Sequence, residues 1–184
     1  QVKYLTETIE ANQAKIVVGF RCFVAHSDKK YFALCVANSI FGGGAHSRLF
    51  NHVREKLSLA YYAASRYDKY KGIITADAGI MLENYQKTLD EIMLQLADIQ
   101  AGNISDKELG AAKAAITNMV RSVADSQSGV LDFSLGEILA GRSPDIEAFC
   151  ESIFAVSAKD VCEAAKMIHQ DTVYMLCGKG GSNQ

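Results

Sequence analysis

Several features that would suggest a membrane or nucleic-acid partner are missing from this sequence. No uninterrupted apolar run approaches the roughly 18 residues that a membrane-spanning helix needs. No run of like charges is longer than a few residues, and 19 Lys and Arg against 21 Asp and Glu leave a net charge of −2. We therefore expect no membrane partner and no nucleic-acid partner, since a phosphate backbone requires a basic surface.

The sequence also lacks the cysteine patterns of zinc sites and thiol exchange. No Cys-x-x-Cys pair occurs, and an odd number of scattered cysteines predicts reduced, mostly buried thiols. This favours a reducing compartment and predicts a cytoplasmic location, with a lone thiol in a secreted protein as the alternative. No leader precedes the first strand-like segment, and Gln1 stands in place of an initiator Met, as in a processed product or a piece of a longer protein. The five cysteines are Cys22, Cys35, Cys150, Cys162 and Cys177.

What the sequence does contain is typical of a folded domain. Its 184 residues are 49% hydrophobic and 22% charged, and no repeat or Pro/Gly/Ser-rich linker divides them, so we expect a single domain over 1–184. Strands and helices follow in blocks, which predicts an α+β sandwich with a mostly antiparallel sheet packed against helices. The expected strands are 2–11, 15–23, 59–67, 72–82 and 172–177, and the expected helices are 29–41, 47–57, 84–101, 105–123, 129–140, 145–154 and 157–168.

Local signals refine these helices. Ser105 with Glu108 predicts a capping box, and Ser157 with Asp160 predicts a cap on the last helix. The apolar residues of 129–133, and those of the helix over 84–101, have helical spacing and are expected in the core. On the helix over 47–57 the apolar residues fall within one arc, which Arg54 borders and from which Glu55 points away. These arc residues are Leu49, Phe50, Val53 and Leu57.

The sequence gives no complete catalytic motif. His52 and Glu55 partly match the H-x-x-E-H zinc motif, but Lys56 occupies the position of the second ligand, and an ammonium repels a dication. We therefore expect no metal site in this chain and interpret His52 and Glu55 as solvated helix residues. The three glycines at 42–44 lack a P-loop lysine and predict a tight turn between helices, and no G-x-S-x-G elbow or Cys-His signature is present.

One segment, residues 41–62, carries a specific family pattern. It resembles the signature block of the C-terminal domain of insulinase/pitrilysin-type zinc metallopeptidases, the inverzincins, which are related to mitochondrial processing peptidase. The opening strand, with Gln13 and Gly19, and the long helices after Leu82 resemble the family more weakly. The residues of the block are Gly42, Gly43, Gly44, Ser47, Arg48, Leu49, Phe50, Arg54, Glu55, Lys56, Leu59, Ala60 and Tyr61.

The resemblance implies two site residues. In that family the zinc ligands and the glutamate base belong to an N-terminal domain, and the C-terminal domain lends an Arg/Tyr pair that binds the substrate backbone near the scissile carbonyl. The matching residues here are Arg54 and Tyr61. Both side chains can donate hydrogen bonds to a peptide carbonyl oxygen, and these bonds become stronger as negative charge develops on that oxygen. Ser58 stands where the family often has Gly, and Tyr62 leaves open which phenol faces the site.

The function implied by the resemblance is substrate binding in a zinc metalloendopeptidase that degrades or processes peptides in an enclosed chamber. This segment, as the C-terminal half of a larger chain, would be inactive alone. Zinc would be bound by an N-terminal domain in the same or a partner chain. The alternatives are a non-catalytic structural or regulatory partner subunit and a generic interaction domain, in which Arg54 pairs with a carboxylate and Tyr61 packs between sheet and helix. Peptide specificity and oligomeric state, a dimer included, stay open.

Overall fold

The computed structural model describes residues 1–10 and 13–178, which contain a five-stranded mixed sheet. Its strands are β1 (Lys3–Ile9), β2 (Ala14–Arg21), β3 (Ala60–Asp68), β4 (Ile73–Ile80) and β5 (His169–Gly178). They lie side by side in the order β1-β5-β2-β4-β3. β1 runs parallel to β5, and the other neighbouring pairs are antiparallel, which confirms the predicted α+β class with a mostly antiparallel sheet.

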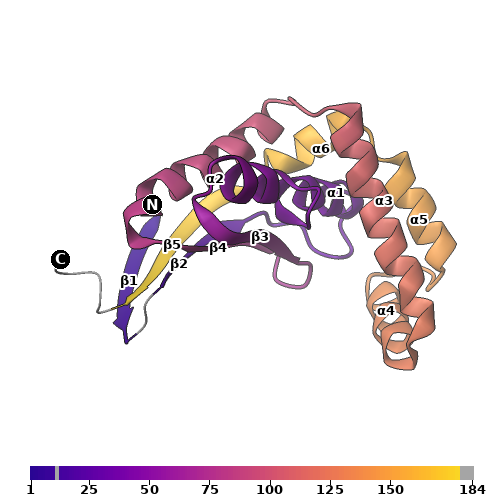
Figure 1. The fold of residues 1–184 in the computed structure, drawn as a ribbon. Coiled ribbons are helices and arrows are strands. Elements are labelled where there is room, and N and C mark those ends of the chain that lie inside the picture. Colours follow the sequence, from indigo (N-terminus) through magenta and orange to yellow (C-terminus); the bar gives the residue numbers. More distant parts are fainter. Residues whose placement is uncertain (11–12, 179–184) are drawn as a thin grey trace.

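The helices lie on one face and at one end of this sheet. Figure 1 shows α1, α2 and α6 over one face, while α3, α4 and α5 stand at the end of the sheet and form what we call the helical arm. None of the described helices covers the opposite face. The helices are α1 (Tyr31–Gly42), η1 (Leu49–Lys56), α2 (Tyr85–Gln100), α3 (Asp106–Ser122), α4 (Gln127–Leu139), α5 (Ile146–Ala155) and α6 (Ala158–Ala165), with short 3₁₀ turns η2 (Leu82–Asn84) and η3 (Val123–Asp125).

The core lies between the sheet and the covering helices. Alternate residues of β2 point into it, and Ile16, Val18 and Phe20 are almost completely buried, as the two-residue period of the sequence predicts. α1 is buried on several sides, and its Leu34 and Val36 are fully buried. Each such side chain contributes roughly 1.5–3 kcal/mol through the removal of apolar surface from water.

The predicted caps are confirmed at both helices. Ser105 Oγ accepts a hydrogen bond from the Glu108 backbone N–H at 3.3 Å, and the Glu108 carboxylate accepts one from the Ser105 N–H at 2.9 Å. Ser157 and Asp160 make the same reciprocal pair at the start of α6. Two backbone donors that have no partner within the helix are thus satisfied at each start.

The helix expected over residues 47–57 is a π-helix, so its predicted apolar face is partly wrong. Leu49 and Val53 are fully buried, but Leu57 is 45% exposed. The Leu57 N–H donates to the His52 carbonyl oxygen, five residues back, and this wider turn moves Leu57 off the buried side.

The prediction that the apolar residues of 129–133 lie in the core is wrong for Val130 and Leu131, while Phe133 packs against the core. Leu131 is 68% exposed, Val130 is 41% exposed, and Phe133 is only partly buried. The buried residues of α4 are Gly136 and Glu137 instead. Most apolar residues of α2 do lie in or against the core, as predicted, although Leu94 is 53% exposed; the buried ones are Leu89, Ile92, Leu96 and Ile99.

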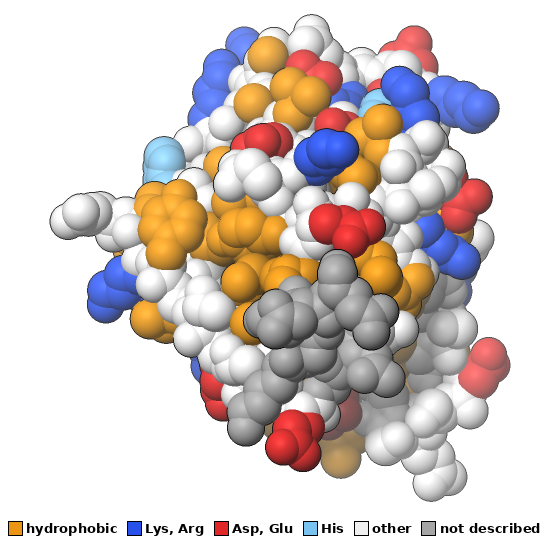
Figure 2. Space-filling view, turned by 60° about the vertical axis from the view of Figure 1, so that its left-hand side comes forward, with side chains coloured by type: hydrophobic (Ala, Val, Ile, Leu, Met, Phe, Trp, Pro, Cys, Tyr) orange, Lys and Arg blue, Asp and Glu red, His pale blue; other side chains and the backbone are white. Residues whose placement is uncertain are grey.

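The side of the molecule that carries β1 exposes apolar side chains as well. Tyr4 and Leu5 of this edge strand are more than half exposed, and Figure 2 shows hydrophobic side chains gathered on that side, with charged side chains of both signs around them. Among the residues that the structure describes, no helix has the length and apolar character needed to cross a bilayer.

Candidate functional site

Arg54 and Tyr61, the two residues that the sequence singles out, line the same hollow. This open hollow of about 510 Å³ lies where η1 ends, β3 begins and β4 ends. Chain segments that are separate in sequence meet there, because β3 pairs with β4 and η1 packs on β3. The residues that line it are Arg54, Glu55, Ser58, Leu59, Ala60, Tyr61, Gly79, Ile80, Met81 and Asn84.

The Arg54 side chain is exposed, and its guanidinium stacks on an aromatic ring. Its guanidinium carbon lies 4.7 Å from the centroid of the Phe50 ring, and its Nε lies 3.5 Å from a carboxylate oxygen of Glu55. The Glu55 contact is a surface ion pair and adds little stability, since both side chains are about half exposed. Stacking on Phe50 restricts the guanidinium while most of its N–H donors still face solvent.

Tyr61 reaches the hollow because β3 carries a bulge at this position. Ala60 pairs with Ile80 and Tyr62 pairs with Gly79, so Tyr61 is the extra residue of the bulge. Its ring lies directly over Gly79, where an added Cβ would come within 2.1 Å of the Tyr61 Cζ atom. A glycine at position 79 is therefore required for this position of the phenol. Tyr61 is 51% exposed and does not pack between sheet and helix.

Tyr62, the second aromatic residue, packs its ring edge-to-face against that of Tyr61, with ring centres 5.1 Å apart, but its polar contacts lie elsewhere. Lys15 Nζ lies 5.7 Å from the centre of its ring, and Lys15 pairs with Asp77 at 3.2 Å. A hydrogen bond with Tyr62 raises the pKa of Lys15, while burial raises the pKa of Tyr62. Of the two phenols, the one that shares the hollow with Arg54 is that of Tyr61.

Sequence reasoning gave no role to Arg48, which anchors the start of η1. Its buried guanidinium donates from Nε to Glu108 at 2.7 Å and from Nη2 to the carbonyl oxygen of Asn103. Burial alone would raise the pKa of Glu108, but hydrogen bonds from Arg48 and Ser105 lower it to about 2. This clasp ties η1 to the start of α3. The sequence pointed to Arg48 only as a member of the family block. It could not identify Glu108 as the partner, because Glu108 lies 60 residues further along the chain.

The partial zinc motif does not form a metal site. The His52 Nδ1 atom lies 3.2 Å from the Gln95 amide nitrogen and 3.6 Å from a Glu91 carboxylate oxygen, and Glu55 is exposed at the rim of the hollow. Within residues 1–10 and 13–178, no group of three or more His, Cys, Asp or Glu side chains could hold a metal ion. The residues present therefore do not fit zinc.

Comparison with known proteins identifies the family. The family described as "Peptidase M16 inactive domain" matches residues 2–116. A relative from Bacillus subtilis named "Probable inactive metalloprotease YmfF" is 35% identical over 183 residues, which cover 100% of this chain and 43% of the relative. The "Uncharacterized zinc protease YmxG" of the same organism is 28% identical. The match covers 97% of this chain and 44% of the relative.

Solved structures agree with this assignment. A conserved protein from Enterococcus faecalis superposes with a TM-score of 0.93 at 32% identity, over 100% of this chain and 43% of that one. A peptidase M16 inactive domain from Pseudomonas fluorescens shares the fold, with a TM-score of 0.78 at 17% identity, over 100% of this chain and 45% of that one. The chain spans less than half the length of the curated relatives named above. It belongs to the peptidase M16 family and corresponds to the inactive domain of that family.

Proposed function

We propose that this domain binds substrate peptides for a zinc metalloendopeptidase whose zinc site lies in another, N-terminal domain of the same or a partner chain. The observation that carries the proposal is the convergence of Arg54 and Tyr61 on one open hollow. Relatives are named zinc proteases, and this domain has no metal site among its described residues, so it would supply substrate contacts and not the metal.

The two side chains suit a peptide carbonyl. The Tyr61 hydroxyl has no hydrogen-bond partner among the described residues, and the Arg54 guanidinium has Glu55 as its one ionic partner there, besides its stacking on Phe50. Both groups donate hydrogen bonds and could therefore hold a carbonyl oxygen. Their contribution would increase as negative charge develops on that oxygen during attack. When bound in the other domain, zinc would supply a Lewis acid and an activated water.

The decisive experiment changes these two residues in the parent protein. We expect Arg54→Ala or Tyr61→Phe to lower kcat/KM for a fluorogenic peptide by roughly tenfold to a thousandfold, the range for loss of one transition-state donor, with zinc content unchanged. Lys56→Ala, in the same last turn of η1, and Tyr62→Phe are matched controls outside the hollow. Wild-type kinetics in both site variants would refute the assignment and favour a generic interaction domain.

A second candidate is a non-catalytic structural or regulatory subunit. It is favoured by the name of the relative YmfF, which describes an inactive metalloprotease. Zinc content and peptide cleavage by the unmodified parent separate the two candidates. If the parent neither binds zinc nor cleaves, the structural or regulatory function replaces the enzymatic one.

We also propose a reducing, cytoplasmic location. All five cysteines are free thiols in the structure, and three of them lie only partly buried, where an oxidising compartment would expose them to pairing or modification. Fractionation of cells that produce the parent, followed by detection of this domain, tests the location directly. Recovery from an extracytoplasmic fraction would contradict it.

A further inference from the structure

The outer side of α4 is apolar and has no partner among the described residues. Five of its side chains are between 41% and 68% exposed, although a monomeric surface rarely gathers so many on one short helix. We call this surface the α4 face. It consists of Val130, Leu131, Leu135, Ile138 and Leu139.

The direction of the α4 face follows from what the helix buries. Glu137, on the inner side of α4, is 2% exposed and accepts hydrogen bonds from Arg142 at 2.7 Å, while its other oxygen lies 2.8 Å from His26 Nε2. A carboxylate buried with such partners cannot turn outward without leaving them unpaired, which is strongly unfavourable. Gly136, next to it, packs closely against Lys69 and Tyr70. Leu131 and Leu139, each 68% exposed, therefore face solvent.

Beside the α4 face lies a large cleft. It has a volume of about 900 Å³ and is lined by residues of α1, the end of β3 and the helical arm, and we call it the arm cleft. Aromatic and aliphatic side chains form most of its wall, among them Tyr31, Met119, Phe133, Leu135 and Phe149. Leu135 also belongs to the α4 face, so the two apolar surfaces are continuous.

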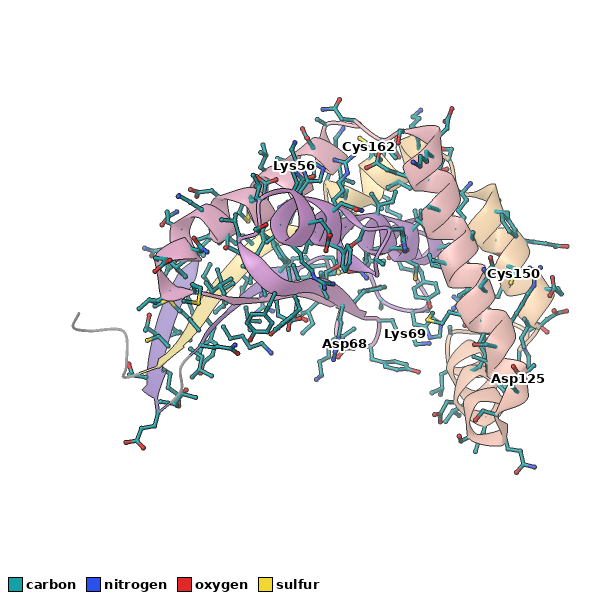
Figure 3. The ribbon with its side chains drawn as sticks, in the orientation of Figure 1. Lys56, Asp68, Lys69, Asp125, Cys150 and Cys162 are labelled. Carbon is teal, nitrogen blue, oxygen red and sulfur yellow. The ribbon has the colours of Figure 1, made fainter. Side chains whose placement is uncertain are left out.

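A lysine that makes no direct ion pair with a described residue lies in the wall of this cleft. Figure 3 shows Lys69 at the end of the sheet next to the helical arm. Its Nζ lies 5.3 Å from the ring centre of Tyr70, and it forms no ion pair with any described carboxylate. Burial lowers the pKa of Lys69. The charge of Glu137 acts on Lys69 from beyond ion-pair distance, but this buried carboxylate is already paired with Arg142 and His26.

We propose that the arm cleft and the α4 face dock a segment of the parent protein outside these 184 residues, and that this segment presents apolar side chains together with a carboxylate for Lys69. More than half of the length of the relatives YmfF and YmxG lies outside the part matched by this chain, so such a segment is available. Apolar continuity and the unpaired ammonium define its chemistry. The inference rests on the proposed partnership with a second domain, but it does not depend on Arg54 or Tyr61.

The first test is zero-length carbodiimide cross-linking of the intact parent, which joins lysines to carboxylates in direct contact. We expect mass spectrometry to find Lys69 joined to an Asp or Glu outside residues 1–184. Lys71, in the same turn and already 3.6 Å from Asp68, is the internal control and should join Asp68. Absence of a Lys69 product while the Lys71 product forms would overturn the proposal, as would a product that links Lys69 to residues 1–184 of a second copy.

The second test uses charge on the α4 face. Leu131→Asp with Leu135→Asp should lower the Tm of the parent by about 4 °C or more, because the docked surface becomes polar. Leu94→Asp, at a similarly exposed position of α2, is the matched control and should leave the Tm of the parent unchanged. An equal fall in Tm for Leu94→Asp, or no fall for the double variant, would contradict docking. Loss of peptide cleavage in the Arg54 variants is a separate readout, so the two proposals can fail independently.

Discussion

Ser58 adopts a left-handed backbone conformation, with a φ of 50°, in the turn between η1 and β3. A side chain in this conformation costs about 1 kcal/mol or more, a cost that glycine would avoid. The turn also lines the hollow, so the backbone that joins Arg54 to Tyr61 passes through a strained residue.

We therefore expect Ser58→Gly to stabilise the domain. Relief of the left-handed strain exceeds the extra entropy of glycine in the unfolded chain, and Tm should rise by about 1–3 °C in a thermal unfolding scan. Ser122→Gly, in the helical conformation at the end of α3, provides a control of opposite sign and should lower Tm. A fall in Tm for both variants would show that Ser58 is not strained.

The bulge in β3 explains why Tyr61, and not Tyr62, lines the hollow with Arg54. Alternation along β3 would send Tyr61 and Tyr62 to opposite faces, so the sequence left their roles open. The bulge adds one residue to the strand and gives Tyr61 its own direction, over Gly79 and beside the end of η1. The position of Tyr61 therefore depends on the pairing partner β4 as much as on its own segment.

At the scale of elements, the clasp between Arg48 and Glu108 connects η1 to α3 and predicts a pH dependence. The pKa of Glu108 is about 2 in the folded protein, against an ordinary value of 4.5. A lowered folded pKa adds stability that is complete above about pH 5 and is lost as the pH falls toward 2. The side chain is partly exposed, so we reduce the full linkage value to about 2 kcal/mol.

Urea denaturation at pH 6 and pH 3 measures this effect. Between these values, the free energy of unfolding of the unmodified domain should fall by about 1 kcal/mol more than that of Glu108→Gln, which has no carboxylate to protonate. Glu151→Gln, which changes an exposed carboxylate of α5, is the control and should retain the full pH dependence. Identical losses in all three proteins would exclude the clasp as the source.

Two elements also show where periodicity misleads. In η1 the five-residue hydrogen bonds of a π-helix replace the 3.6-residue repeat, and Leu57 leaves the buried face. In α4 helical spacing was correct, but the apolar side faces outward, because Glu137 is buried instead. Spacing identifies an apolar face but not what covers it.

At the scale of the whole molecule, the domain holds one wall of the proposed site and no described metal site. We therefore expect the 184-residue chain alone to show no zinc-dependent hydrolysis of a fluorogenic peptide, whereas the parent, assayed under identical conditions with zinc content measured, cleaves it. Zinc-dependent cleavage by the 184-residue chain alone would contradict the proposal that zinc and its activated water belong to another domain.

The sequence by itself determined the strands, most helices, both capping boxes and the family. These features depend on local chemistry: side-chain alternation, caps three residues apart and a block of some twenty positions. The tertiary structure alone decided the bulge that places Tyr61 over Gly79, the clasp of Arg48 and the outward direction of α4. The physical reason is that these features rest on partners far away in the chain, 60 residues from Arg48 to Glu108 and 111 from His26 to Glu137, and such pairs become neighbours only when the elements pack.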